Sequence, residues 1–106
     1  MKEIKAFIHR NRVADVVRAL HAADVRHLSV IDVKGLLEAL DTREQDYCVE
    51  IGAMVITEVK LEVVCQDEDH TAEAVRIILE HGRTGQIEAG WIYISDIQTA
   101  LPIQGG

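Results

Sequence analysis

The sequence is poor in aromatic residues, cysteine and proline, and it has no long hydrophobic run. Aromatic side chains make up only 4% of the residues, so an interior of Val, Ile, Leu and Ala is expected. Two cysteines, Cys48 and Cys65, are too few for a disulfide scaffold and indicate reduced thiols in the cytoplasm. No segment approaches the roughly 18 apolar residues of a membrane span, and no basic-then-apolar leader opens the sequence.

Basic residues are also scarce. Eleven Lys and Arg stand against 18 Asp and Glu, which gives a formal net charge of −7. Nucleic acid is therefore not expected as a partner, because a protein neutralises phosphates with a basic surface. The sequence does contain 48% hydrophobic and 27% charged residues over 106 positions, as one globular domain spanning 1–106 requires.

The N-terminal part predicts a strand followed by a helix. Residues 1–8 alternate, with Ile4, Ala6 and Ile8 on one face, which indicates a half-buried strand. Asn11 stands where a helix N-cap is expected. Apolar residues then recur mostly at three- and four-residue spacing and predict one amphipathic helix: Val13, Val16, Val17, Leu20 and Ala23.

Two further strands follow along the chain. Residues 25–33 contain β-branched and aliphatic side chains and are expected to form the second strand. Residues 51–65 are rich in Val and Ile, and Val59, Leu61 and Val63 alternate with polar neighbours in their later half. This alternation predicts a strand with one buried face, the strongest strand signal in the sequence.

A second helix, a last strand and a tail complete the chain. The helix is expected to begin at Asp67 or Asp69 and to end before Gly82, which suits a C-cap. Its apolar residues at helical spacing are Ala72, Val75, Ile78 and Leu79. Residues 91–95 predict the fourth strand, and residues 97–106 form a C-terminal tail.

The element order predicts the fold class. Strand–helix–strand occurs twice, which is typical of an α+β, ferredoxin-like βαββαβ sandwich. Such a fold has a four-stranded antiparallel sheet with two helices on one face. The connection between the halves, residues 36–53, is long for a compact domain and predicts a projecting loop, which is typical of functional or mobile segments. Alternatively, its two ends extend the flanking strands into a projecting hairpin.

Four segments, in this order and spacing, resemble the PII signalling proteins over essentially the whole chain. These segments are residues 1–6, 33–35, 59–64 and 83–94. Within the last, Thr-Gly-Gln-Ile-Glu-Ala-Gly is similar to the family signature Thr-Gly-x-Ile-x-x-Gly, and an aliphatic strand follows it. Residues 36–53 fall where the family carries its T-loop.

The resemblance implies a homotrimer that binds a small ligand, ATP or ADP in the family, in clefts between subunits. Its T-loops would then regulate a protein target, a membrane transporter or an enzyme. The implied ligand-binding residues are Ser29, Gly35, Leu36, Val64, Arg83, Thr84, Gly85, Gln86, Ile87, Gly90 and Trp91. The implied docking residues are Glu38, Asp41, Arg43, Tyr47 and Cys48.

Several positions depart from the family pattern. Where PII proteins place cationic side chains around the phosphates, this chain has Glu38, Trp91, Pro102 and Gln104. Ile51 replaces the tyrosine that is uridylylated in the family, and Ala39 replaces the glutamine that organises magnesium and 2-oxoglutarate. The resemblance therefore implies a divergent regulator with weakened phosphate contacts, whose ligand is ATP, ADP, AMP or another anion.

The sequence also bears on two other functions, metal binding and enzymatic activity. The metal alternative is a divalent ion bound by the trimer, with a link to heavy-metal efflux. No two of the five histidines form an i,i+4 pair, so histidines from neighbouring subunits would have to converge on the ion. These histidines are His9, His21, His27, His70 and His81. Enzymatic activity is not expected, because no nucleophile elbow, Walker loop or acid–base constellation is present. Trp91 is predicted to lie in a cleft or subunit interface, where it could stack on a planar ligand.

Overall fold

The computed structural model describes residues 1–31, 58–87 and 89–105. The elements in chain order are β1 (Lys2–His9), the 3-10 turn η1 (Arg10–Arg12), α1 (Val13–Ala22), β2 (Leu28–Ile31), β3 (Glu58–Cys65), α5 (Glu68–His81) and β4 (Gly90–Asp96). The predicted loop over 36–53 lies outside the described residues.

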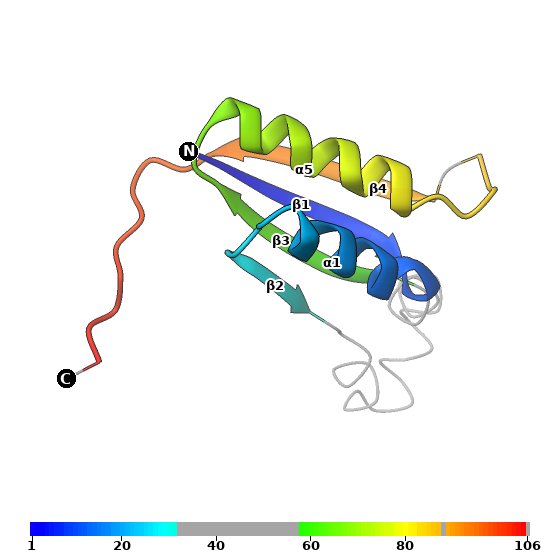
Figure 1. Ribbon diagram of the computed structural model, residues 1–106, viewed down its shortest axis with the longest axis horizontal. Coiled ribbons are helices and arrows are strands. Elements are labelled where there is room, and N and C mark those ends of the chain that lie inside the picture. Colours follow the sequence, from blue (N-terminus) through cyan, green and yellow to red (C-terminus); the bar gives the residue numbers. More distant parts are fainter. Residues whose placement is uncertain (32–57, 88, 106) are drawn as a thin grey trace, which may run out of the picture.

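The four strands form one antiparallel sheet in the order β2-β3-β1-β4, and both helices lie on the same face of it (Figure 1). This arrangement confirms the predicted ferredoxin-like sandwich. The two central strands, β1 and β3, pair along their full length from Lys2 opposite Cys65 to His9 opposite Glu58. β2 and β4 therefore form the two edges of the described sheet.

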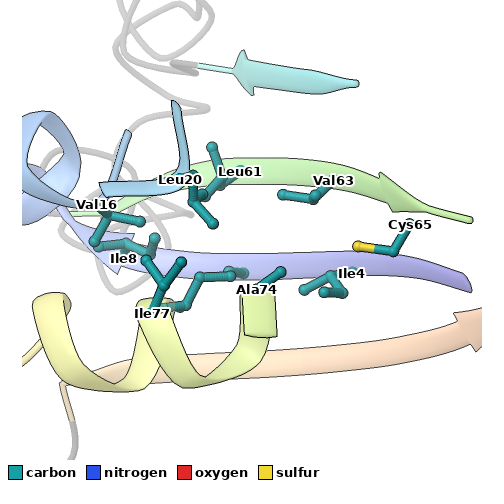
Figure 2. Packing of buried hydrophobic residues seen from close by; sticks show 11 residues of the cluster. Ile4, Ile8, Val16, Leu20, Leu61, Val63, Cys65, Ala74 and Ile77 are labelled. Carbon is teal, nitrogen blue, oxygen red and sulfur yellow. The ribbon is translucent and has the colours of Figure 1, made fainter. Parts of the chain in front are cut away.

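The core lies between the sheet and the helices, as the two sequence periods predict. Ile4, Ala6 and Ile8 of β1 are at most 3% exposed, which confirms the period-two pattern. Figure 2 shows these side chains packed with others from β3 and both helices. The further members of this cluster are Val16, Leu20, Leu61, Val63, Cys65, Ala74, Ile77 and Ile78. Burial of this aliphatic surface is the main stabilising contribution to the fold.

The helix N-termini differ from each other. Asp67 caps α5 through its carboxylate, which accepts a hydrogen bond from the His70 amide at 2.8 Å, so the predicted N-cap is confirmed. The prediction for Asn11 is wrong, because the turn η1 separates β1 from α1. The Asn11 amide instead donates to the His9 Nδ1 at 3.2 Å, and α1 follows Arg12 without a side-chain cap.

Two apolar patterns differ from the prediction. β2 begins at Leu28 and not at Val25, since the Val25 amide still donates to the Leu20 carbonyl at 3.0 Å as the chain leaves α1. The end of the predicted strand, residues 32–33, lies outside the described residues. In α5 the fully buried stripe includes Ala74 and Ile78, whereas Leu79 is 60% exposed. The stripe follows three- and four-residue steps from Thr71, and Leu79 falls beside it.

Cys65 ends β3 as a small buried side chain with 4% exposure. Burial raises the pKa of its thiol, and a hydrogen bond with Thr71 opposes that rise without overcoming it. The reactive thiolate is thereby disfavoured. We expect Cys65 to stay unmodified by iodoacetamide in the folded protein and to react fully after denaturation. Mass spectrometry of the peptide that contains Cys65 measures this, and rapid native labelling would contradict the burial.

The C-terminal tail leaves the body of the protein after β4 (Figure 1). The Ile97 amide donates to the Met1 carbonyl at 3.1 Å, which holds the start of the tail beside β1. Beyond it, Leu101 and Ile103 are 83% and 98% exposed. The tail predicted for residues 97–106 is described through residue 105.

Candidate functional site

A pocket of about 390 Å³ lies where α5 ends and β4 begins. The segment that joins these two elements forms one wall, and the end of β1 contributes Phe7 and Ile8. Seven residues predicted from the sequence line this pocket together: Arg83, Thr84, Gly85, Gln86, Ile87, Gly90 and Trp91. Its volume lies within the usual range for small-molecule sites.

Local backbone geometry shapes the segment between α5 and β4. The Gly82 amide donates to the Ile78 carbonyl at 2.9 Å, so Gly82 ends the helix as expected. Gly85 has φ +85°, a left-handed conformation that glycine adopts without steric cost. The Gln86 amide donates to the Thr84 hydroxyl at 3.3 Å, which forms a local turn. These features let the backbone line an open pocket wall.

Gly90 is required by the sheet itself. It pairs with Ile8 of β1 at φ +152°, and a Cβ at this position would come within 1.9 Å of the Phe7 carbonyl oxygen. The resemblance implies that Gly90 lies at a ligand-binding edge. The structure adds that strand pairing alone demands a glycine there.

Aromatic side chains gather next to the pocket. Trp91 is 57% exposed and lies outside the core, directly opposite Phe7 in the β1–β4 register. The Phe7 and Tyr93 rings meet edge to face, with their centroids 6.0 Å apart. An indole in this position offers a planar ligand an exposed aromatic surface.

Sequence reasoning did not identify all residues of the pocket. The apolar part of its lining also includes Phe7, Ile8, Ile78, Leu79, Ala89 and Ile92. Leu79 had a usable signal, because it is an apolar residue one step beside the buried stripe of α5. The β1 residues gave no such signal in the sequence, since Phe7 lies on the less buried face of an ordinary alternating strand.

The other predicted ligand-binding residues lie elsewhere. Ser29 is exposed on β2 and Val64 is half-buried on β3. β2 and β4 are separated by two strands, or roughly 14 Å at ordinary strand spacing. One chain therefore does not bring Ser29 beside Trp91. Gly35 and Leu36 lie outside the described residues, as do the docking residues Glu38, Asp41, Arg43, Tyr47 and Cys48.

Charged residues on the face of the sheet opposite the helices are paired. The Lys60 ammonium lies 2.9 Å from the Glu62 carboxylate, and that of Lys5 lies 3.8 Å from Glu3. The hydrogen bond from Lys60 is the main reason that the pKa of Glu62 is below its ordinary value. These two ion pairs place charges of both signs side by side among the described residues of this face.

The described segments contain no group of three His, Cys, Asp or Glu side chains able to hold a metal ion. His70 is paired with Asp67, its Nδ1 lying 2.8 Å from the carboxylate. Across these same segments, no helix has both the length and the apolar character needed to cross a membrane.

The fold and the pocket define an α+β sandwich protein with a ligand-sized pocket beside one edge strand. Residues 1–106 match the nitrogen regulatory protein P-II family. Nitrogen regulatory protein P-II 1 of Methanothermobacter thermautotrophicus is 34% identical, with 100% of this chain and 91% of the relative aligned. Nitrogen regulatory protein P-II of Cereibacter sphaeroides is 36% identical, with 100% and 94% aligned. The chain therefore belongs to the P-II family, whose members are regulatory proteins.

Proposed function

We propose that this protein is a P-II-type signalling trimer that senses a small ligand, an adenyl nucleotide or another anion, in clefts between its subunits. Family membership over the whole chain is the observation that carries the proposal. The pocket supports it, because seven residues predicted for ligand binding converge there within one chain. Regulation, without catalysis by the protein itself, is the proposed activity.

The split of the predicted site between two sheet edges supports a closed ring. Ser29 lies on the β2 edge and Trp91 on the β4 edge, and a single sheet keeps these edges apart. A heterologous contact that places the β2 edge of one copy near the β4 edge of the next would join them. Three such contacts close a trimer with three equivalent clefts. Pairing of exposed edges in this way also protects them from aggregation.

The output would pass through the loop over 36–53. Ligand binding in the cleft shifts the population of two loop states when the ligand has different affinities for them. One state then docks onto a cytoplasmic protein target, a membrane transporter or an enzyme. The protein itself neither inserts into the membrane nor binds nucleic acid in this proposal.

Sedimentation and calorimetry together test the proposed function. At micromolar concentration we expect a particle of three 11.8 kDa chains and saturable heat on titration with at least one of ATP, ADP and AMP. Each nucleotide is titrated with and without magnesium. A monomer in sedimentation contradicts the ring, and silence with all three nucleotides contradicts nucleotide sensing.

A further inference from the structure

We infer that the pocket at the end of α5 binds a planar ligand through a single anionic group, as in a nucleoside monophosphate, so that second and third phosphates add little affinity. This inference rests on the proposed function and specifies the ligand of the same site. Three features of the pocket carry it: one available cation, an apolar remainder and an exposed indole.

Arg83 is the available cation. It is exposed on the pocket wall, and among the described residues it has no hydrogen-bond or ion-pair partner. Other cationic side chains in the same part of the chain are already engaged. The ion pairs are Lys2 with Asp96, Lys5 with Glu3, Arg12 and Arg18 with Asp15, Arg26 with Asp24, Lys60 with Glu62, and Arg76 with Glu73 and Glu80. Arg10 also has a partner.

A guanidinium without an ion-pair partner among the described residues is a distinctive feature in a protein of net charge −7. Arginine binds phosphate through parallel N–H donors, and these charge-assisted hydrogen bonds are stronger than neutral ones. No ion pair between Arg83 and another described residue has to be broken before it binds an anion. It is therefore suited to hold one phosphate at the pocket.

The remaining described lining supplies no second cation. Gln86 and Thr84 are neutral, and the other residues are glycine, alanine, aliphatic or aromatic. Trp91, with 57% exposure, provides the planar surface for a heterocyclic ring. A ligand whose ring stacks on Trp91 and whose single phosphate binds Arg83 would contact both the aromatic and the charged group of this lining. A second or third phosphate would find no matching charge on these residues.

Calorimetry with adenosine, AMP, ADP and ATP tests whether one phosphate accounts for the affinity, first without magnesium and then with it. Charged hydrogen bonds contribute about 1.5–3 kcal/mol, so we expect AMP to bind about tenfold or more tightly than adenosine. ADP and ATP should bind within about threefold of AMP, since the added phosphates meet no further cation. An affinity that rises about tenfold with each added phosphate would overturn the inference.

Arg83→Gln provides the decisive comparison, because this exposed residue has no partner among the described residues whose loss would disturb their packing. It should reduce AMP affinity to that of adenosine and leave adenosine binding unchanged. Arg76→Gln on α5 removes the same charge away from this pocket and should alter neither affinity. Equal AMP binding by the Arg83→Gln variant and the unmodified protein would overturn the inference while leaving the proposed function standing. Silence with all four ligands would overturn both.

Discussion

Replacement of Gly90 by alanine should destabilise the protein by about 3 kcal/mol or more, through left-handed strain and overpacking together. The new Cβ would lie 1.9 Å from the Phe7 carbonyl oxygen, so the backbones of β1 and β4 would have to separate. The pairing of Gly90 with Ile8 would be lost first, and this pair borders the pocket. Ligand binding should therefore weaken together with stability. Urea unfolding and nucleotide calorimetry measure the two effects.

Gly85→Ala is the matched control for this variant. Gly85 also has positive φ, at +85°, but a Cβ there would meet nothing within 4 Å. Only the backbone strain of a left-handed alanine remains, about 1–2 kcal/mol. Equal destabilisation by the two substitutions would show that the close approach to Phe7 does not matter.

Truncation of Leu61 to alanine should cost about 2–5 kcal/mol of unfolding free energy, because it creates a cavity in a packed core. Leu61 is 1% exposed on the central strand β3 and stands opposite Ala6 of β1. In Figure 2 its side chain lies within the buried cluster. Neighbouring elements can collapse only partly around the missing atoms. A shift in the midpoint of chemical denaturation at constant slope reports the loss.

Leu101→Ala removes the same atoms from the exposed tail. With 83% of Leu101 exposed, the change should be within about 0.5 kcal/mol if this surface stays in water. Comparison of the two variants separates the effect of burial from the effect of residue type. A larger loss at Leu101 than at Leu61 would place the main core elsewhere.

Most of the fold followed from periodicity. The period-two pattern of Ile4, Ala6 and Ile8 and the helical spacing of Val16 and Leu20 both matched the observed burial. These patterns are local, since a residue's face depends on its own neighbours in sequence. Helix ends were harder to place. Asn11 is a good N-cap by residue type, yet an intervening 3-10 turn moved the start of α1 to Val13.

The candidate site was only partly predictable. A contiguous segment, residues 83–87 with Gly90 and Trp91, could be identified from the family signature and does line one pocket. Phe7 could not be placed there from its own position, because it approaches the pocket from β1. Leu79 of α5 had only the signal of an apolar residue beside the buried stripe. Ser29 and Val64 were grouped with the segment through the resemblance, while the fold of one chain holds Ser29 at the opposite edge of the sheet.

Residue type and spacing along the chain account for the strand and helix pattern, the aliphatic core and membership of the family. What those residues face depends on the tertiary structure. Sheet pairing brings Gly90 against the Phe7 carbonyl, where only glycine fits. Packing leaves Arg83 beside an apolar pocket without a partner among the described residues. Such contacts join residues far apart in sequence, and their strength depends on distance and burial, which only the folded chain sets.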